Sequence, residues 1–193
     1  MVSLSLVQSM DQKNGSNPRE LEQLLARIAA GEQEALAQLY SRTRGAVYAL
    51  ALSYLKNPHD AQDTAQDTYV QVWENAEKYR PQGSPMAWLL TIARNLARLR
   101  LRQAGRQESL EHQEWEAIPA GEEGVSPEDR HLLQEALAAL GEQERQIILL
   151  HSTAGLRHRE IAALLELPLP TVLSKYHRAL KKLKKQMEGD DAR

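Results

Sequence analysis

The sequence predicts an all-α protein of two small helical domains joined by a flexible acidic linker, the second domain ending in a helix-turn-helix. Apolar residues recur at helical spacing through most of the 193 residues, and no alternating run is long enough for a convincing strand. The 10 Gly and 8 Pro fall mostly between these periodic segments, where loops are expected. Hydrophobic residues make up 42% of the chain, which is enough to form real cores.

The first predicted domain, residues 18–106, contains four helices. Two of them span residues 18–30 and 32–55. Asn57-Pro58 starts the third, because Asn is a good cap and Pro suits a first turn, and this helix is expected to reach residue 78. Ser84-Pro85 opens the fourth helix, which continues to residue 104.

The second predicted domain, residues 127–188, follows a polar, acidic linker over 107–126 that is expected to have little fixed structure. Its helices are expected over 127–140, 142–151, 156–165 and 170–185. The short turn between the last two leaves room only for a sharp crossing, which is helix-turn-helix spacing. Residues 1–17 and 189–193 are interpreted as a disordered leader and tail, with Met10 as an alternative start.

Composition restricts the class of protein. The chain has no cysteine, which excludes disulfides, thiolate zinc sites and thiol redox sensors within it and fits a cytoplasmic protein. The opening MVSLSLVQSM lacks the basic region and cleavage site of a signal peptide, and its apolar run is too short to span a bilayer. No phosphate-binding Gly-rich loop, metal-spaced cluster or nucleophile with a base partner is present, so we expect no enzyme, no metal and no cofactor.

Charge is segregated along the chain, although the formal net charge is only -2. Residues 94–106 carry five arginines and no acid, and residues 107–129 carry eight acids and no Lys or Arg. The segment from 157 to 185 is basic again. Blocks of this kind indicate different partners for different segments, because a phosphate backbone attracts the basic ones and repels the acidic one.

The last helix has one apolar and one polar face on a helical wheel. Val172, Tyr176, Ala179, Leu180 and Leu183 share the apolar face. The opposite face combines short polar groups near the N-terminus with cations further along, which is what a recognition helix needs. A solvated, lysine-rich final helix is the alternative.

Two segments resemble one known family. GLRHREIAALLELPLPTVLSKYHRALKKL resembles the fourth conserved region of the extracytoplasmic-function sigma factors of bacterial RNA polymerase, and DAQDTAQDTYVQVW resembles their second. The resemblance covers about residues 20–105 and 127–185. It implies a promoter-specificity subunit that binds core RNA polymerase and promoter DNA, takes no small-molecule substrate, and is regulated by an anti-sigma factor, often one at the membrane. A free-standing helix-turn-helix regulator that binds DNA as a dimer is the rival interpretation.

The resemblance also implies three groups of site residues. For duplex DNA at the minus-thirty-five element they are Thr171, Ser174, Lys175, Arg178, Lys181 and Lys182. For the opened strand at the minus-ten element they are Tyr79, Arg80, Gly83, Ser84, Arg94, Asn95, Arg98 and Arg102. For core polymerase they are Asp60, Asp63, Gln66, Asp67 and Glu74, which otherwise form an ordinary solvated stripe.

Other features remain open or depart from the family pattern. Trp73 and Trp88 follow the apolar period of their helices and are interpreted as core rather than base-stacking residues. The linker is either a solvated tether or, as the resemblance implies, an acidic segment in the path of nascent RNA. Leu99 and Leu173 stand where the family often has Asp and a cation, which affects promoter preference. Glu166 replaces a frequent Gly, so we expect a left-handed residue there at a cost of roughly 1 kcal/mol.

Overall fold

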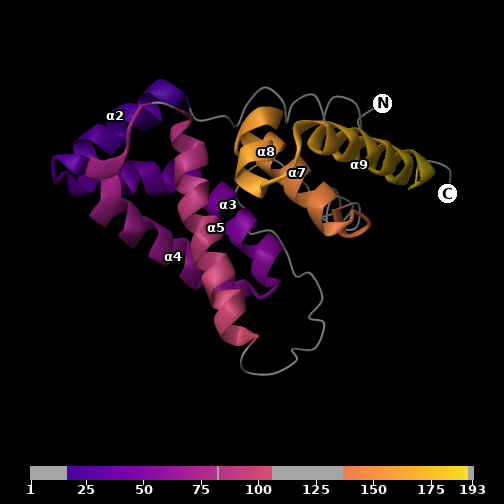
Figure 1. Ribbon diagram of the computed structural model, residues 1–193, viewed down its shortest axis with the longest axis horizontal. Coiled ribbons are helices and arrows are strands. Elements are labelled where there is room, and N and C mark those ends of the chain that lie inside the picture. Colours follow the sequence, from indigo (N-terminus) through magenta and orange to yellow (C-terminus); the bar gives the residue numbers. More distant parts are fainter. Residues whose placement is uncertain (1–16, 82, 106–136, 191–193) are drawn as a thin grey trace.

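The structure is a computed structural model that describes residues 17–81, 83–105 and 137–190. These residues form helices and no strand, which confirms the predicted all-α class. The helices gather into two groups, one of α2 to α5 and one of α7 to α9 (Figure 1). Among the described residues, no helix is both long and apolar enough to cross a membrane.

The first group follows the predicted helix starts closely. It consists of α2 (Pro18–Ala29), α3 (Gln33–Leu55), α4 (Pro58–Asn75), the 3-10 turn η1 (Ala76–Lys78) and α5 (Pro85–Ala104). The Asn57 side chain accepts hydrogen bonds from the N–H groups of His59 and Asp60, at 2.9 and 3.2 Å. The Ser84 hydroxyl accepts one from Ala87 N–H at 3.3 Å. Asn17, assigned from the sequence to the leader, caps α2 in the same way.

The second group consists of α7 (Glu142–Ser152), α8 (His158–Leu165) and α9 (Leu169–Asp190). Helix α8 begins two residues after its predicted start, and α9 extends beyond its predicted end at 185 into the segment interpreted as tail. The predicted leader over 1–16, the linker over 107–126, the helix segment 127–136 and residues 191–193 lie outside the described residues.

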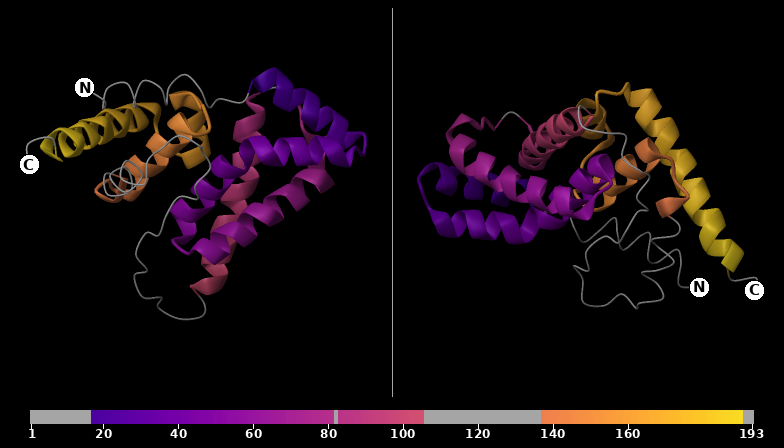
Figure 2. Two further views of the ribbon diagram at one scale, coloured as in Figure 1. Left: turned by 180° about the vertical axis from the view of Figure 1, so that it is seen from behind. Right: turned by 90° about the horizontal axis from the view of Figure 1, so that it is seen from below.

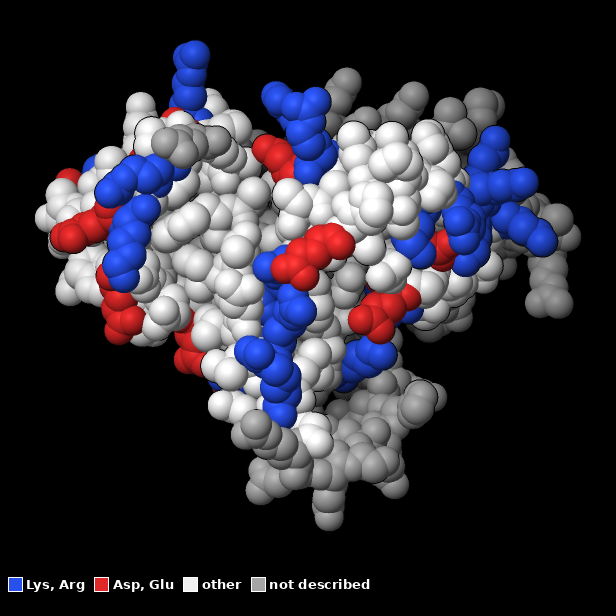
Figure 3. All heavy atoms as spheres, viewed as in Figure 1, with Lys and Arg blue, Asp and Glu red and all other residues white. Residues whose placement is uncertain are grey.

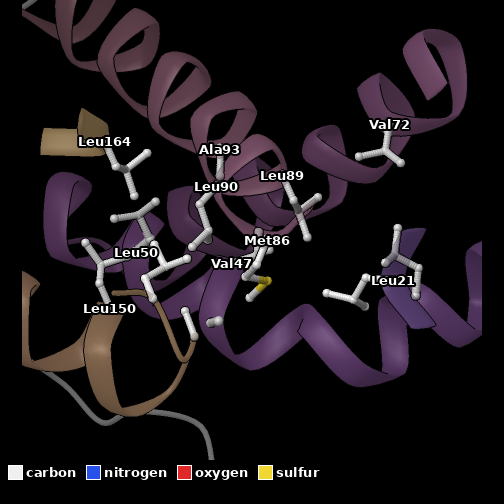
Figure 4. Close-up of a cluster of buried hydrophobic side chains, with 14 of the residues drawn as sticks. Leu21, Val47, Leu50, Val72, Met86, Leu89, Leu90, Ala93, Leu150 and Leu164 are labelled. Atoms are coloured by element: carbon white, nitrogen blue, oxygen red, sulfur yellow. The ribbon is translucent and has the colours of Figure 1, made fainter. Parts of the chain in front are cut away.

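The two helix groups share a buried apolar core. Leu50 of α3 and Leu90 and Ala93 of α5 belong to the same cluster as Leu150 of α7 and Leu164 of α8 (Figure 4). All five side chains are less than 4% exposed. The contact between the groups is therefore a buried apolar interface that continues the core of the first group, and not a contact of exposed side chains alone.

Helix α9 lies at the outer edge of the molecule. Helix α7 packs on α3, α8 packs on α5, and α9 packs on α7 and α8 (Figures 1 and 2). A second buried cluster, which includes Ile148, Leu149, Ala179 and Leu183, holds α9 against α7. One face of α9 is thus buried within the second group, and the other is turned away from the rest of the protein.

Candidate nucleic-acid and polymerase interfaces

Helices α8 and α9 meet in a tight turn. Glu166 ends α8 with φ 57° and ψ 39°, and its N–H donates to carbonyls of the last turn. This left-handed conformation confirms the expectation from the sequence. Leu167 N–H donates to Ala162 O at 3.0 Å, and α9 begins at Leu169 after a single further residue. The crossing is therefore set by local backbone hydrogen bonds.

The outward face of α9 is rotated from the one that the wheel predicts. Ser174, Arg178, Lys181 and Lys185 are exposed, whereas Thr171 and Lys175 are half-buried. The Lys182 Nζ donates to Glu144 Oε2 of α7 at 2.6 Å, so this lysine also fixes the helix to its own group. Of the six predicted duplex contacts, four are therefore exposed, Lys182 among them, and two are half-buried.

Two residues that the sequence interpretation left out share this outward face. His177 is exposed, and Leu173 is 37% exposed although its neighbour Val172 is completely buried. The signal was available, because both residues lie beyond 90° from Val172 on a helical wheel.

Glu144 is the buried acid that anchors α9. Its carboxylate accepts hydrogen bonds from Lys182 Nζ at 2.6 Å and from Gly141 N–H at 3.1 Å, and Arg178 Nε lies 3.9 Å away. Burial by itself would raise the pKa of Glu144, but the hydrogen bonds from Lys182 and Gly141 and the charges of Lys182 and Arg178 lower it overall. The carboxylate is therefore ionised and paired at neutral pH.

Aromatic rings join α9 to the two helices beneath it. The His151 and His158 rings stack with centroids 4.7 Å apart, and the Tyr176 ring meets His158 edge-on at 4.5 Å. Burial, and then the charges of His151 and His177, lower the pKa of His158, so this imidazole is neutral at neutral pH. The three rings belong to the support of α9 rather than to its outward face.

The loop from Tyr79 to Ser84 is held by its own side chains. The Tyr79 ring packs edge-on against Trp88 at 5.4 Å, and its hydroxyl donates to Gly83 O at 3.4 Å. Burial, and then Glu22, raise the pKa of Tyr79. Arg80 is exposed, and its guanidinium donates hydrogen bonds to the carbonyl oxygens of Glu77 and Tyr79 at 2.7 and 3.1 Å. Gly83 has open space around the place of a Cβ.

Helix α5 carries the predicted strand-binding cations, but one of them is buried. Arg94 is 9% exposed; its guanidinium donates to Leu164 O of α8 and pairs with Glu166 at 3.2 Å. Arg98 pairs with the same carboxylate at 3.1 Å, while Asn95 and Arg102 are exposed. The basic side chains over α5 and α9 gather in two separate areas of one face (Figure 3).

The predicted polymerase-binding residues lie together along the exposed side of α4. Asp60, Asp63, Gln66, Asp67 and Glu74 are all exposed. The buried side of α4 consists of Ala61, Thr64, Ala65, Thr68, Tyr69 and Val72. Arg100 of α5 reaches across to this stripe, with its guanidinium 2.5 Å from Asp67 and 3.7 Å from Asp63. Part of the acidic charge is therefore already paired within the chain.

The core interpretation is wrong for Trp73 and consistent with the packing of Trp88. Trp73 is 37% exposed and Val70 is 55% exposed on α4, whereas Trp88 packs against the buried cluster. The buried positions of α4 end in Tyr69 and Val72, and Trp73 falls one residue beyond this stripe. An apolar pair thus adjoins the acidic stripe on the surface of α4.

Comparisons with known proteins agree with this geometry. The family Sigma-70 region 2 matches residues 39–107, and the family Sigma-70, region 4 matches residues 130–183. An ECF RNA polymerase sigma factor SigK of Mycobacterium bovis (strain BCG / Pasteur 1173P2) is 33% identical over 172 residues, which cover 86% of this chain and 92% of the relative. The SigK of Mycobacterium sp. (strain KMS) is 31% identical, over 86% of this chain and 89% of its own.

Two solved structures share the fold. CnrH, in complex with the cytosolic domain of CnrY, matches with a TM-score of 0.60 and 27% identity over 89% of this chain and 99% of its own. The sigma factor RpoE of Bartonella quintana, in complex with the anti-sigma factor NepR, matches with a TM-score of 0.64 and 24% identity over 79% and 96%. The matched regions follow the order of the two helix groups and cover most of each, and the chain therefore belongs to the extracytoplasmic-function sigma factors, the promoter-specificity subunits of bacterial RNA polymerase.

Proposed function

We propose that the three surfaces divide the work of promoter recognition. The exposed side of α4 binds core RNA polymerase, the loop from Tyr79 to Ser84 and the cations of α5 hold the opened strand, and the outward face of α9 reads duplex DNA upstream. The chain works in the cytoplasm as a binding subunit rather than an enzyme, and an anti-sigma factor restrains it. The observation that carries the proposal is the placement of the acidic stripe and the outward face of α9 on different helix groups.

The α4 surface has the chemistry of a protein-docking site. It combines exposed carboxylates with the exposed apolar side chains of Val70 and Trp73. A large aromatic group next to charged ones is typical of residues that dominate binding energy in interfaces.

Opening a strand without ATP requires that the protein hold the unpaired state. Cationic side chains that bind the phosphate backbone, together with a base-sized pocket, are the physical means.

The α9 surface has the chemistry of duplex recognition. Ser174 and Arg178 lie in the second and third turns of α9 and could reach base edges, and Lys181 and Lys185 follow where the phosphate backbone would run. Leu173 adds an exposed apolar group beside them, and an apolar side chain in the major groove contacts the methyl group of thymine. We therefore add Leu173 and His177 to the predicted duplex contacts.

The test of polymerase binding uses two variants that break the same ion pair. Asp67→Asn removes a carboxylate from the α4 surface, whereas Arg100→Ala breaks its 2.5 Å pair and leaves the carboxylate in place. We expect Asp67→Asn to weaken competition for core polymerase about tenfold, as for the loss of one charge-assisted hydrogen bond. Arg100→Ala should bind core polymerase as tightly as the parent or more tightly. Equal loss in both variants would mean that the pair stabilises the fold and that Asp67 does not dock.

Reconstituted transcription tests the function as a whole. Core polymerase with this chain, given a promoter library, should start transcripts downstream of a common two-part motif. A footprint of the chain alone on a symmetric duplex, without any effect on polymerase, would instead support the free-standing regulator.

A further inference from the structure

The contact between α5 and α8 brings a carboxylate onto the arginines that are proposed to hold the opened strand. Arg94 and Arg98 of α5 both pair with Glu166, at 3.2 and 3.1 Å, and Arg94 also donates to Leu164 O. We propose that Glu166 occupies the place of a DNA phosphate, so that the two helix groups must separate before α5 can bind the strand. This rests on the proposed strand-binding role of α5.

Glu166 is poorly suited to its position unless the arginines are there. It ends α8 in a left-handed conformation that favours glycine, at φ 57°. Its negative charge also lies at the C-terminal end of a helix, where the helix dipole is negative and favours cations. Arg94 and Arg98 offset both disadvantages, because one guanidinium binds a C-terminal carbonyl and both bind the carboxylate.

Arg94 cannot reach a nucleic acid in this arrangement. Only 9% of the residue is exposed, and its Nε is buried without a hydrogen-bond partner. A guanidinium buried with an unsatisfied donor is costly, which favours any rearrangement that gives it a full complement of acceptors. A phosphate in the open arrangement would supply such acceptors, since it can accept from two donors of the same guanidinium.

The contact extends beyond the ion pairs into an apolar interface. Leu164 and Leu150 of the second group lie in one buried cluster with residues of the first group (Figure 4). Leu149 of α7 and its C-cap Thr153 line a narrow crevice together with Ala46 and Ser53 of α3. Lys56, the C-cap of α3, pairs with Glu142 of α7 at 3.4 Å. The closed arrangement is thus held by apolar burial as well as by charge, and losing Glu166 should loosen it without unfolding either group.

The test measures binding of the purified full chain to a fluorescein-labelled single-stranded oligothymidine. Glu166→Gln keeps the size of the side chain and removes its charge, and Glu166→Gly also relieves the left-handed strain, so it cannot fail through misfolding at this position. Since Glu166 is exposed and water screens its two ion pairs, we expect both variants to bind about three- to tenfold more tightly than the parent. Glu34→Gln, an equal loss of charge at an exposed site on α3, should bind as the parent does.

Salt dependence gives a second readout that a merely structural role would not change. In the parent, added salt weakens both the arginine–phosphate contacts and the competing pairs with Glu166, so its effects partly cancel, whereas in Glu166→Gln only the displacement of counterions from the strand remains. The slope of log affinity against log salt should therefore steepen by about 0.7 for each arginine freed.

A distance measurement tests the opening itself. The chain has no cysteine, so the exposed positions Ala37 and Lys185 can be changed to cysteine and labelled with a dye pair. Adding oligothymidine to the labelled parent should lengthen the distance between the dyes. In Glu166→Gln the same lengthening should occur at lower concentrations of oligothymidine.

The outcomes separate the inference from the proposed function. If Arg98→Ala weakens binding but both Glu166 variants bind as the parent does, or if binding leaves the dye distance unchanged, Glu166 does not compete with the strand and this inference is overturned. If adding Arg98→Ala to Glu166→Gln leaves oligothymidine binding unchanged, α5 is not the strand-binding surface, and the proposed role of its cations fails together with the inference.

Discussion

Replacing Glu144 with Gln should destabilise the protein by about 2 kcal/mol. The side chain is only 7% exposed and accepts one charge-assisted hydrogen bond from Lys182 and one hydrogen bond from Gly141 N–H. A hydrogen bond to a charged group contributes about 1.5–3 kcal/mol, but Lys182 is 45% exposed, so water screens the pair and the lower part of that range applies. The amide keeps an acceptor for Gly141 and places an NH₂ group against the ammonium of Lys182.

The control is Glu142→Gln, two residues earlier on the same helix. Glu142 pairs with Lys56 at 3.4 Å, but both side chains are more than half exposed, so this change should cost no more than about 0.5 kcal/mol. The free energies of unfolding are measured by urea titration with far-UV circular dichroism. Equal losses in the two variants would refute the assignment of Glu144 as the anchor of α9.

The pH dependence of the stability difference between the parent and Glu144→Gln gives an independent check. Because the pKa of Glu144 is lowered in the folded protein, its contribution is fully present above the ordinary pKa of a glutamate, about 4.3, and is lost as the pH falls through the folded value. The difference in stability between the parent and Glu144→Gln should therefore be constant near neutral pH and shrink below about pH 4. A difference that persists unchanged in acid would contradict the ionic origin of the effect.

Three further predictions follow from single contacts. Tyr69→Phe removes the 2.8 Å hydrogen bond between buried hydroxyls of Tyr69 and Thr43 and should lower the free energy of unfolding by about 1 kcal/mol in a urea titration, whereas Tyr40→Phe, half exposed, should not. Asn57→Ala removes the cap of α4 and should cost about 1 kcal/mol in the same assay, with Asn57→Asp close to the parent. Replacing a thymine that Leu173 contacts by deoxyuridine removes the methyl group and should weaken promoter binding by the holoenzyme that contains the parent chain. The holoenzyme with Leu173→Ala should bind both promoters equally. If the replacement weakens binding by the same factor in both proteins, Leu173 makes no methyl contact.

Helix starts and the α8–α9 turn could be predicted because their causes are local. Asn57 and Ser84 act through their own side chains on N–H groups two or three residues away. The left-handed residue at Glu166 is expected because it stands at a helix end where the family often has Gly, and a helix end of this kind is a local feature. These features need no knowledge of what packs elsewhere.

The contact between the helix groups could not be predicted in the same way. Leu90 and Ala93 fit the core of the first group on periodicity alone, and nothing in their spacing shows that Leu150 and Leu164 join them. The resemblance implied that Arg94 binds the opened strand together with Arg98 and Arg102, but its guanidinium is buried against α8, because a carbonyl at a helix end and a carboxylate from a distant segment accept its hydrogen bonds. Pairings between segments about 70 residues apart leave no local pattern.

The mixed composition of the α5–α8 contact makes it sensitive to two separate variables. Its centre is apolar, and apolar association weakens on cooling. Its rim is ionic and half exposed, and dissolved sodium chloride weakens such pairs by screening them. Low temperature and high salt should therefore weaken the same contact by unrelated mechanisms. In a cell exposed to both at once, a larger fraction of this protein would have its two helix groups separated.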